Sequence, residues 1–185
     1  MNIVFARIKY SKIYPANFIG YLDTVAALKR SMRIAGWPLK FTQGFNPRIK
    51  FSHGPPLSLG FFSNAEYMDV FLEKPLEGYQ IEKFKKSTIE GLIIEYVEIH
   101  SNGELPINKK LKGFRFLVES EKGEEIRVLN TENIVEKGKE RIIFDIYKEN
   151  GSFKNPGKQL EDGKYRFTKI NCIWKEKNEK EGNEL

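Results

Sequence analysis

The chain has 185 residues and a net charge of +6, and 40% of its residues are hydrophobic. This length suits one compact domain or two small, tightly packed halves. No run approaches the roughly 18 apolar residues that a membrane span needs. Arg7, Lys9 and Lys12 come too early for a signal-peptide core, and the single Cys172 excludes an internal disulfide. We therefore expect a cytoplasmic protein with no membrane contact.

Positive charge is concentrated at the start of the chain. Residues 1–53 hold nine lysine and arginine side chains and one acid, Asp23, which gives this segment a net charge of +8. The other 132 residues hold 22 basic and 24 acidic side chains, which gives −2. Such an excess attracts phosphate-rich partners if the cations gather on one surface, as we expect here. The alternative is a solvated surface that only keeps the protein soluble.

The first two elements differ in hydrophobic period. Residues 2–10 alternate between apolar and other side chains, which predicts a half-buried strand. Residues 17–35 repeat apolar side chains at steps of three and four, which predicts an amphipathic helix with Asn17 as its N-cap and Gly36 as its stop.

A segment rich in glycine and proline follows, at residues 37–61. We predict short strands near 39–42, 48–53 and 57–62, separated by turns. Residues 65–73 alternate again and predict a longer strand.

Residues 75–87 are compatible with a helix, and the apolar, β-branched residues 92–99 predict a strand. The order β-α-β-β-α-β predicts an α+β fold whose N-terminal unit is ferredoxin-like, with an elaborated middle loop. The strand-rich second half either extends the first sheet or forms a reduced second ferredoxin-like unit.

The second half contains short strand patterns and turn signals. We predict strands at residues 113–120, 125–130, 141–147 and 164–174, with one helical turn near 156–160. The predicted organisation is a basic unit at 1–100, a linker at 101–111, the strand-rich half at 112–174, packed on the first, and a disordered tail at 175–185.

The residues that usually bind metals or form covalent intermediates are few. Two histidines and one cysteine exclude a structural zinc site or an iron–sulfur cluster held by this chain, so no metal and no cofactor is expected. Cys172 lies in a strand pattern and is expected in the core. No phosphate-binding glycine loop and no serine nucleophile motif is present. These observations favour a non-catalytic protein without excluding an enzyme.

Three carboxylates remain as catalytic candidates. Asp23 is the one acid among 53 residues, and Glu66 and Asp69 lie on the predicted strand at 65–73. Carboxylates act in catalysis when their surroundings shift the pKa or fix them on a substrate. The alternative is that Asp23 pairs with a nearby base and Asp69 with a lysine or arginine across the sheet.

The loop at residues 42–48 is the most specific feature of the sequence. Gln43 and Asn46 offer donors and acceptors, Phe45 offers a ring, and Arg48 and Lys50 supply charge. This combination suits base stacking together with phosphate contact. The alternative is a structural turn with Asn46 as a cap and Phe45 in the core.

One face of the predicted sheet carries aromatic and basic side chains. Alternation places Phe5, Arg7 and Lys9 together with Tyr67 and Phe71. An open sheet with such a face holds single-stranded RNA in RNA-recognition folds, although no motif of that family is present here. Alternatively, the second half covers this face and the aromatics are interdomain core.

Residues 17–73 also carry a recognisable combination of motifs. The run 43–47, Gln-Gly-Phe-Asn-Pro, is followed by 65–69, Ala-Glu-Tyr-Met-Asp, and residues 154–156 read Lys-Asn-Pro. This combination resembles an uncharacterised bacterial family, a domain of unknown function found fused to, or encoded near, radical SAM proteins. Family members often carry histidine where Tyr21 and Arg48 stand here.

The resemblance implies RNA-related or translation-related work and a separate radical SAM protein as partner. We therefore expect an accessory module that binds RNA or another polyanion. The alternatives are an RNA-modifying enzyme, or its substrate-presenting subunit, that uses Asp23 or Asp69, and a module that binds only a radical SAM protein. The residues predicted to contact nucleic acid are Arg7, Lys9, Lys29, Arg30, Arg33, Gln43, Phe45, Asn46, Arg48 and Lys50.

Overall fold

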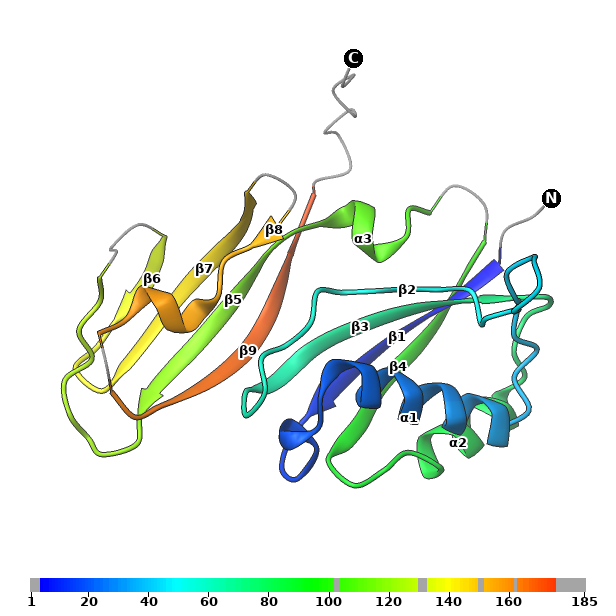
Figure 1. The fold of residues 1–185 in the computed structure, drawn as a ribbon, viewed down its shortest axis with the longest axis horizontal. Helices are drawn as coiled ribbons and strands as arrows, with labels where there is room; N and C mark the ends of the chain where they lie inside the picture. The colour runs from blue at the N-terminus through cyan, green and yellow to red at the C-terminus, as the bar shows by residue number, and fades with distance from the viewer. Residues whose placement is uncertain (1–3, 102–103, 130–132, 150–151, 162, 176–185) are drawn as a thin grey trace, which may run out of the picture.

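One mixed sheet runs through the molecule, and the two longest helices pack on its N-terminal half (Figure 1). The computed structural model describes residues 4–101, 104–129, 133–149, 152–161 and 163–175. The elements are β1 (Val4–Lys12), η1 (Ala16–Phe18), α1 (Tyr21–Ile34), β2 (Phe51–His53), β3 (Phe62–Leu72), α2 (Gly78–Lys86), β4 (Leu92–Ser101), α3 (Ile107–Lys110), β5 (Leu111–Ser120), β6 (Ile134–Lys137), β7 (Arg141–Glu149), β8 (Ser152–Phe153), η2 (Pro156–Gln159) and β9 (Tyr165–Trp174). Seven of the nine described strands follow the order β4-β1-β3-β9-β5-β7-β6.

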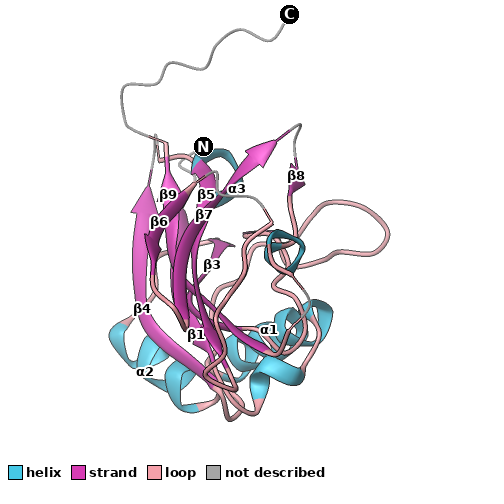
Figure 2. Cartoon of the chain, turned by 90° about the vertical axis from the view of Figure 1, so that its left-hand side faces the viewer, coloured by secondary structure: helices cyan, strands magenta, loops and turns pink. Residues whose placement is uncertain are grey.

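The N-terminal half is built around β1. This strand pairs antiparallel with β3 on one side and with β4 on the other, and the three-residue β2 pairs antiparallel with β3. Helices α1 and α2 both lie on one face of these strands (Figure 2). The predicted mixed α+β class is confirmed.

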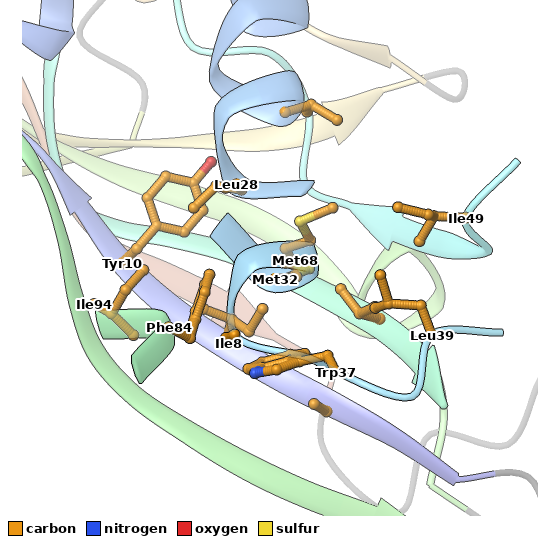
Figure 3. Packing of buried hydrophobic residues seen from close by; sticks show 14 of the residues in the cluster. Ile8, Tyr10, Leu28, Met32, Trp37, Leu39, Ile49, Met68, Phe84 and Ile94 are labelled. Atoms are coloured by element: carbon orange, nitrogen blue, oxygen red, sulfur yellow. The ribbon is translucent and has the colours of Figure 1, made fainter. Parts of the chain in front are cut away.

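Alternation along β1 supplies the core between sheet and helices. Ile8 and Tyr10 point toward α1 and α2, where they meet Leu28, Met32 and Phe84 (Figure 3). Each of these five side chains is at most 1% exposed. Burying a large apolar side chain of this kind stabilises a fold by about 1.5–3 kcal/mol, so this layer fixes α1 against the sheet.

Helix α1 begins later than the sequence pattern predicts. Gly20, not Asn17, is the N-cap, and Asn17 lies buried in η1, where its side-chain amide donates to the Gly60 carbonyl at 3.2 Å. The helix period continues through η1, so periodicity alone does not reveal the break. The C-terminal prediction is closer: the last helical residue is Ile34, and Gly36 takes a positive φ of 72°.

The segment between α1 and β3 contains less strand than predicted. Residues 39–42 and 48–53 form two isolated bridges, Leu39 with Leu72 and Phe41 with Ile49, and the short β2. The strand predicted at 57–62 is wrong, because residues 54–61 form a loop and β3 begins at Phe62. Pro55 and Pro56 lack backbone donors and cannot pair as a central strand would.

The second half extends the first sheet, which was one of the two predicted arrangements. Strand β9 joins β3 in parallel at Phe62–Thr168 and Ser63–Lys169, and β5, β7 and β6 continue outward by antiparallel pairing. A second core forms here around Phe114, Phe116 and Phe144.

Three details of the second half differ from expectation. The strand predicted at 125–130 is a loop in its described part, with one bridge between Val128 and Leu160, and the described β6 was not predicted. The expected linker at 101–111 contains α3. The helical turn predicted near 156–160 is η2, and residues 176–185 of the predicted tail lie outside the described residues. No helix in the described chain has the length and apolar character needed to cross a membrane.

Candidate functional site

A group of cations lies on α1 and on the loop after it. Burial lowers the pKa of the Lys29 ammonium. The positive charges of the nearby Arg33 and Arg48 lower it further. The Lys29 ammonium lies 3.7 Å from the centre of the Phe51 ring, which itself packs on the helix-side core. Arg30 is exposed on the same helix. We call Lys29, Arg30, Arg33 and Arg48 the α1–loop surface.

Among the described residues, no acid neutralises this surface. Within the described part of the chain, none of its four cations makes an ion pair with a carboxylate. Like charges held together without a counterion create a positive field that favours a polyanion. A positive field of this kind attracts the phosphate groups of a nucleic acid.

The remaining predicted cations do not join this surface, so the expectation of a single basic surface is wrong. Lys50 lies 5.0 Å from the Phe71 ring centre and Lys9 lies 5.8 Å from that of Tyr96, on the face opposite the helices. Lys12 is buried. The reason is the strand period, which sends alternate side chains to opposite faces.

Arg7 is buried and forms hydrogen bonds within the protein instead of facing a ligand. Its guanidinium donates twice to Asp69, at 2.8 and 2.9 Å, once to the Leu105 carbonyl at 2.9 Å, and also pairs with Glu104 at 3.4 Å. The backbone N–H of Ile107 donates to Asp69 at 2.7 Å. The network ties the segment before α3 to the sheet, and it argues against Arg7 as an RNA contact.

Two of the three predicted catalytic carboxylates, Asp69 and Asp23, have contrasting surroundings. Asp69 is 0% exposed and its oxygens accept from three donors, which argues against a catalytic role. Asp23 is exposed in the first turn of α1, where the helix dipole favours an anion, and no ion pair to it occurs among the described residues. Asp23 therefore stays available, although nothing around it builds a site.

The 41–48 loop projects its side chains into solvent. All eight residues are exposed, and Phe45 is 108% exposed, so the alternative that placed its ring in the core is wrong. The loop is closed by Arg48, whose backbone N–H donates to the Thr42 hydroxyl at 3.0 Å. Gln43 and Asn46 stand beside the ring on the exposed turn.

The aromatic face of the sheet is largely covered. Tyr67 belongs to the second core with Trp174, whose ring centre is 5.0 Å away, and Phe5 is buried against His100 at 5.1 Å. For Tyr67 this is the predicted alternative, in which the second half covers that face, whereas the His100 ring that covers Phe5 belongs to β4 of the first half. The open sheet face proposed for RNA is therefore absent from the part of the chain that the structure describes.

Metal and thiol chemistry find no support in the described residues. These contain no group of three or more histidine, cysteine, aspartate or glutamate side chains placed to hold a metal ion. Cys172 is buried, and burial raises its thiol pKa to about 12. A thiol held protonated in this way is a poor nucleophile.

A cleft that sequence reasoning did not find lies where the two halves meet. Its volume is about 590 Å³, and one wall is the loop from Gly54 to Phe61. The other wall is formed by β5, β7 and the segment after β8. The lining residues include Lys148, Lys154 and Lys169 but no acid. Only the fold assembles these side chains, which are far apart in the sequence.

Lys169 and His53 line this cleft, and the buried Lys12 and Glu66, which line a separate small pocket that shares His53, lie beside them; we call these four residues the floor. Lys12, Lys169 and Glu66 are each 2% exposed. Lys169 makes an ion pair with Glu66, without the orientation of a good hydrogen bond, and its ammonium lies 4.4 Å from the Phe114 ring centre. The Lys12 ammonium donates to the Ile19 carbonyl at 2.7 Å. Burial is the main effect on the pKa of Lys12 and lowers it. The negative charge of Glu66 raises this pKa, and the positive charge of Lys169 lowers it.

A neutral histidine completes the floor. His53 Nδ1 donates to the Gly54 carbonyl at 2.7 Å, which leaves Nε2 to accept from the Tyr10 hydroxyl at 2.7 Å. Burial is the main cause that lowers the pKa of His53 and raises that of Tyr10. The ring of Tyr21 meets His53 edge-on at 5.1 Å.

The fold and these surfaces define a small α+β protein with one extended sheet, a basic helix surface and a cationic cleft between its halves. The chain belongs to the family described as an uncharacterized protein conserved in bacteria (DUF2344), whose model matches residues 6–183. Comparison with curated proteins and with solved structures gave no match.

Proposed function

We propose that this protein is an accessory module that binds RNA through the α1–loop surface. The observation that carries the proposal is the grouping of Lys29, Arg33 and Arg48 without an acidic partner in the described chain. Phosphate contacts supply most of the affinity of such an interface and make it sensitive to salt. The surface has four cations rather than the nine of the whole segment, so we expect modest affinity.

The neighbouring loop favours single-stranded RNA among polyanions. Phe45 offers both faces of its ring to solvent, and an unpaired base stacks on such a ring for about 1–3 kcal/mol. Gln43 and Asn46 carry amide donors and acceptors at the same turn. Stacking of this kind tolerates any base, so we expect weak sequence preference.

The partner that we infer is a separate radical SAM protein in the cytoplasm. The support is the motif resemblance, which includes the Gln-Gly-Phe-Asn-Pro run at 43–47. Within the described residues this chain has no set of thiolates for an iron–sulfur cluster, so the cluster would belong to the partner. A pull-down that still recovers a radical SAM protein after nuclease treatment would support a direct protein contact.

A catalytic role in RNA modification rests on Asp23 alone. Its carboxylate is exposed at the start of α1, on the helix that carries three cations of the α1–loop surface. An Asp23→Asn variant that keeps full activity in a reconstituted modification reaction would remove this candidate.

The N-terminal half fits a ferredoxin-like unit. The order β4-β1-β3, with β2 on the far side of β3, antiparallel pairing and one helix in each crossover supports this interpretation. Such a unit leaves the outer surface of its helices open, which is where the α1–loop surface lies.

The test is RNA binding by variants matched in charge. The triple variant Lys29→Gln, Arg33→Gln, Arg48→Gln should bind a fluorescent 20-nucleotide single-stranded RNA at least about tenfold more weakly than the wild type at low salt, as read by anisotropy. The control, Lys122→Gln, Lys139→Gln, Lys164→Gln, removes the same charge from exposed positions of the second half and should bind like the wild type. No binding by the wild type, or equal loss in both variants, would refute the proposal.

A further inference from the structure

We propose that the cleft between the two halves binds a nucleoside monophosphate or a compound of the same chemistry, a flat apolar body that carries a phosphate monoester. The cleft is separate from the α1–loop surface, and the inference does not depend on RNA binding there. Three features of the cleft, its size, its walls and the charge of its floor, lead to this class of ligand.

The size and walls fit a planar organic molecule. The cleft holds about 590 Å³, inside the range of about 300–1,000 Å³ that is usual for small-molecule sites. Phe61, Phe114, Phe116 and Phe153 contribute rings to its lining. The lining therefore combines aromatic rings with aliphatic side chains and with amide and ammonium groups at a few points, as in sites that select ligands by both shape and charge.

The floor carries uncompensated positive charge. Lys12 and Lys169 share one carboxylate, that of Glu66, and burial lowers the pKa of His53, which favours its neutral form. The buried cluster therefore has a net charge of about +1. A buried charge without a partner is costly, so an anion that reaches the floor would be stabilised there.

The rim adds the charge that a phosphate monoester requires. Lys154 pairs with Glu149 at 2.8 Å, whereas Lys148 makes no ion pair among the described residues. The floor and Lys148 together present about two positive charges, which match the charge of about −1.5 to −2 on a phosphate monoester at neutral pH. A carboxylate ligand would leave part of this charge unpaired.

The segment 154–156 places an amide donor at the cleft. Asn155 Oδ1 accepts from the Gly157 backbone N–H at 2.9 Å, which leaves its side-chain NH₂ group free to donate. Asn108 lines the cleft on another side. These groups are suited to the polar edge of a base. The Lys-Asn-Pro run, which takes no part in the α1–loop surface, thereby acquires a role in ligand binding.

Calorimetric titration tests the proposal with defined probes. AMP, GMP, CMP and UMP, the four nucleosides and inorganic phosphate are titrated into the whole protein. We expect at least one monophosphate to bind with a Kd below about 1 mM, and its nucleoside and phosphate alone to bind at least about tenfold more weakly. Absence of binding by all four monophosphates, or equal binding of phosphate alone, would overturn the proposal.

Variants assign the binding to the cleft. Lys148→Gln and Phe153→Ala should each raise the Kd of the monophosphate at least about fivefold, an effect of the size expected for one charged or aromatic contact. Lys158→Gln, a matched change on the exposed turn of η2 outside the lining, should leave the Kd unchanged. Unchanged binding in both cleft variants, with folding intact by circular dichroism, would overturn the assignment.

Two further arms separate this site from the proposed RNA interface and identify the source of the ligand. The Lys29, Arg33, Arg48 triple variant should bind the monophosphate normally while losing RNA, and loss of both would move the site away from the cleft. A 5′-phosphorylated tetranucleotide that competes as well as the monophosphate would indicate an RNA end as the source. A tetranucleotide that fails to compete would indicate a free nucleotide; either source is consistent with the proposed chemistry.

Discussion

At the scale of single residues, Arg7 shows how a cation expected at a surface becomes part of the interior. Its guanidinium and the Asp69 carboxylate form a two-bond ion pair, with 8% and 0% of their side chains exposed. Arg7→Met should destabilise the protein by about 3–5 kcal/mol, because it leaves the Asp69 charge buried without its partner. Urea denaturation measures this free energy of unfolding.

Arg115→Gln supplies the matched comparison for that prediction. Arg115 and Asp145 form an ion pair of the same geometry, at 2.8 Å, but the arginine side chain is 38% exposed. Solvent screens the arginine of this pair, although the Asp145 side chain is only 6% exposed, so loss of Arg115 should cost about 1–2 kcal/mol, less than loss of Arg7. Equal losses in the Arg7 and Arg115 variants would show that burial does not set the cost.

His53 makes the stability of the fold depend on pH. Burial lowers its pKa below the ordinary 6.5, so between the folded pKa and 6.5 the unfolded chain binds the proton more readily than the folded protein. This contribution to stability is complete above pH 6.5 and is lost as the pH falls through the folded pKa. His53→Gln should lose less stability than the wild type between pH 7 and 5 in urea titrations; parallel curves would contradict this account.

Phe45 separates a binding role from a structural one. Because the ring is fully exposed, Phe45→Ala should leave the urea midpoint unchanged. The same change should weaken the binding of single-stranded RNA by about 1–3 kcal/mol if a base stacks on the ring. Fluorescence anisotropy measures the affinity, and Phe45→Trp is the control that keeps stacking. An unchanged affinity in Phe45→Ala would remove the ring from the interface.

At the scale of elements, Gly91 sets the turn between α2 and β4. Its φ is +82°, and an added Cβ would lie 2.6 Å from the backbone nitrogen of Ala16. Gly91→Ala should therefore cost about 3 kcal/mol in urea denaturation, through both strain and a clash with backbone. Gly36→Ala has a similar φ of +72° with open space around it and should cost about 1 kcal/mol. Equal costs would show that the clash is relieved.

The periodic elements were predictable from the sequence, and the irregular ones were not. Residues 65–73 were recognised as a strand because alternation reports a half-buried surface. The end of η1 before Gly20 was missed, because the apolar period continues through the break. The loop at 54–61 contains apolar residues that line the cleft, so it resembles a strand in composition.

At the scale of the whole molecule, the continuous sheet decides which residues meet. The parallel pairing of β9 with β3 places Lys169 beside Glu66 and His53, and no local pattern predicts that junction. The candidate site was predicted only in part for the same reason. The cations of α1 stay together because one helix presents them, whereas those of β1 are divided between two faces.

The salt dependence of RNA binding tests the central claim most directly. The slope of log K against log salt is about −0.7 per phosphate neutralised on a single strand. We predict that the Lys29, Arg33, Arg48 triple variant has a slope shallower than that of the wild type by about 2, whereas the charge-matched variant at Lys122, Lys139 and Lys164 keeps the wild-type slope. Identical slopes for the wild type and the α1–loop variant would contradict the assignment of RNA binding to this surface.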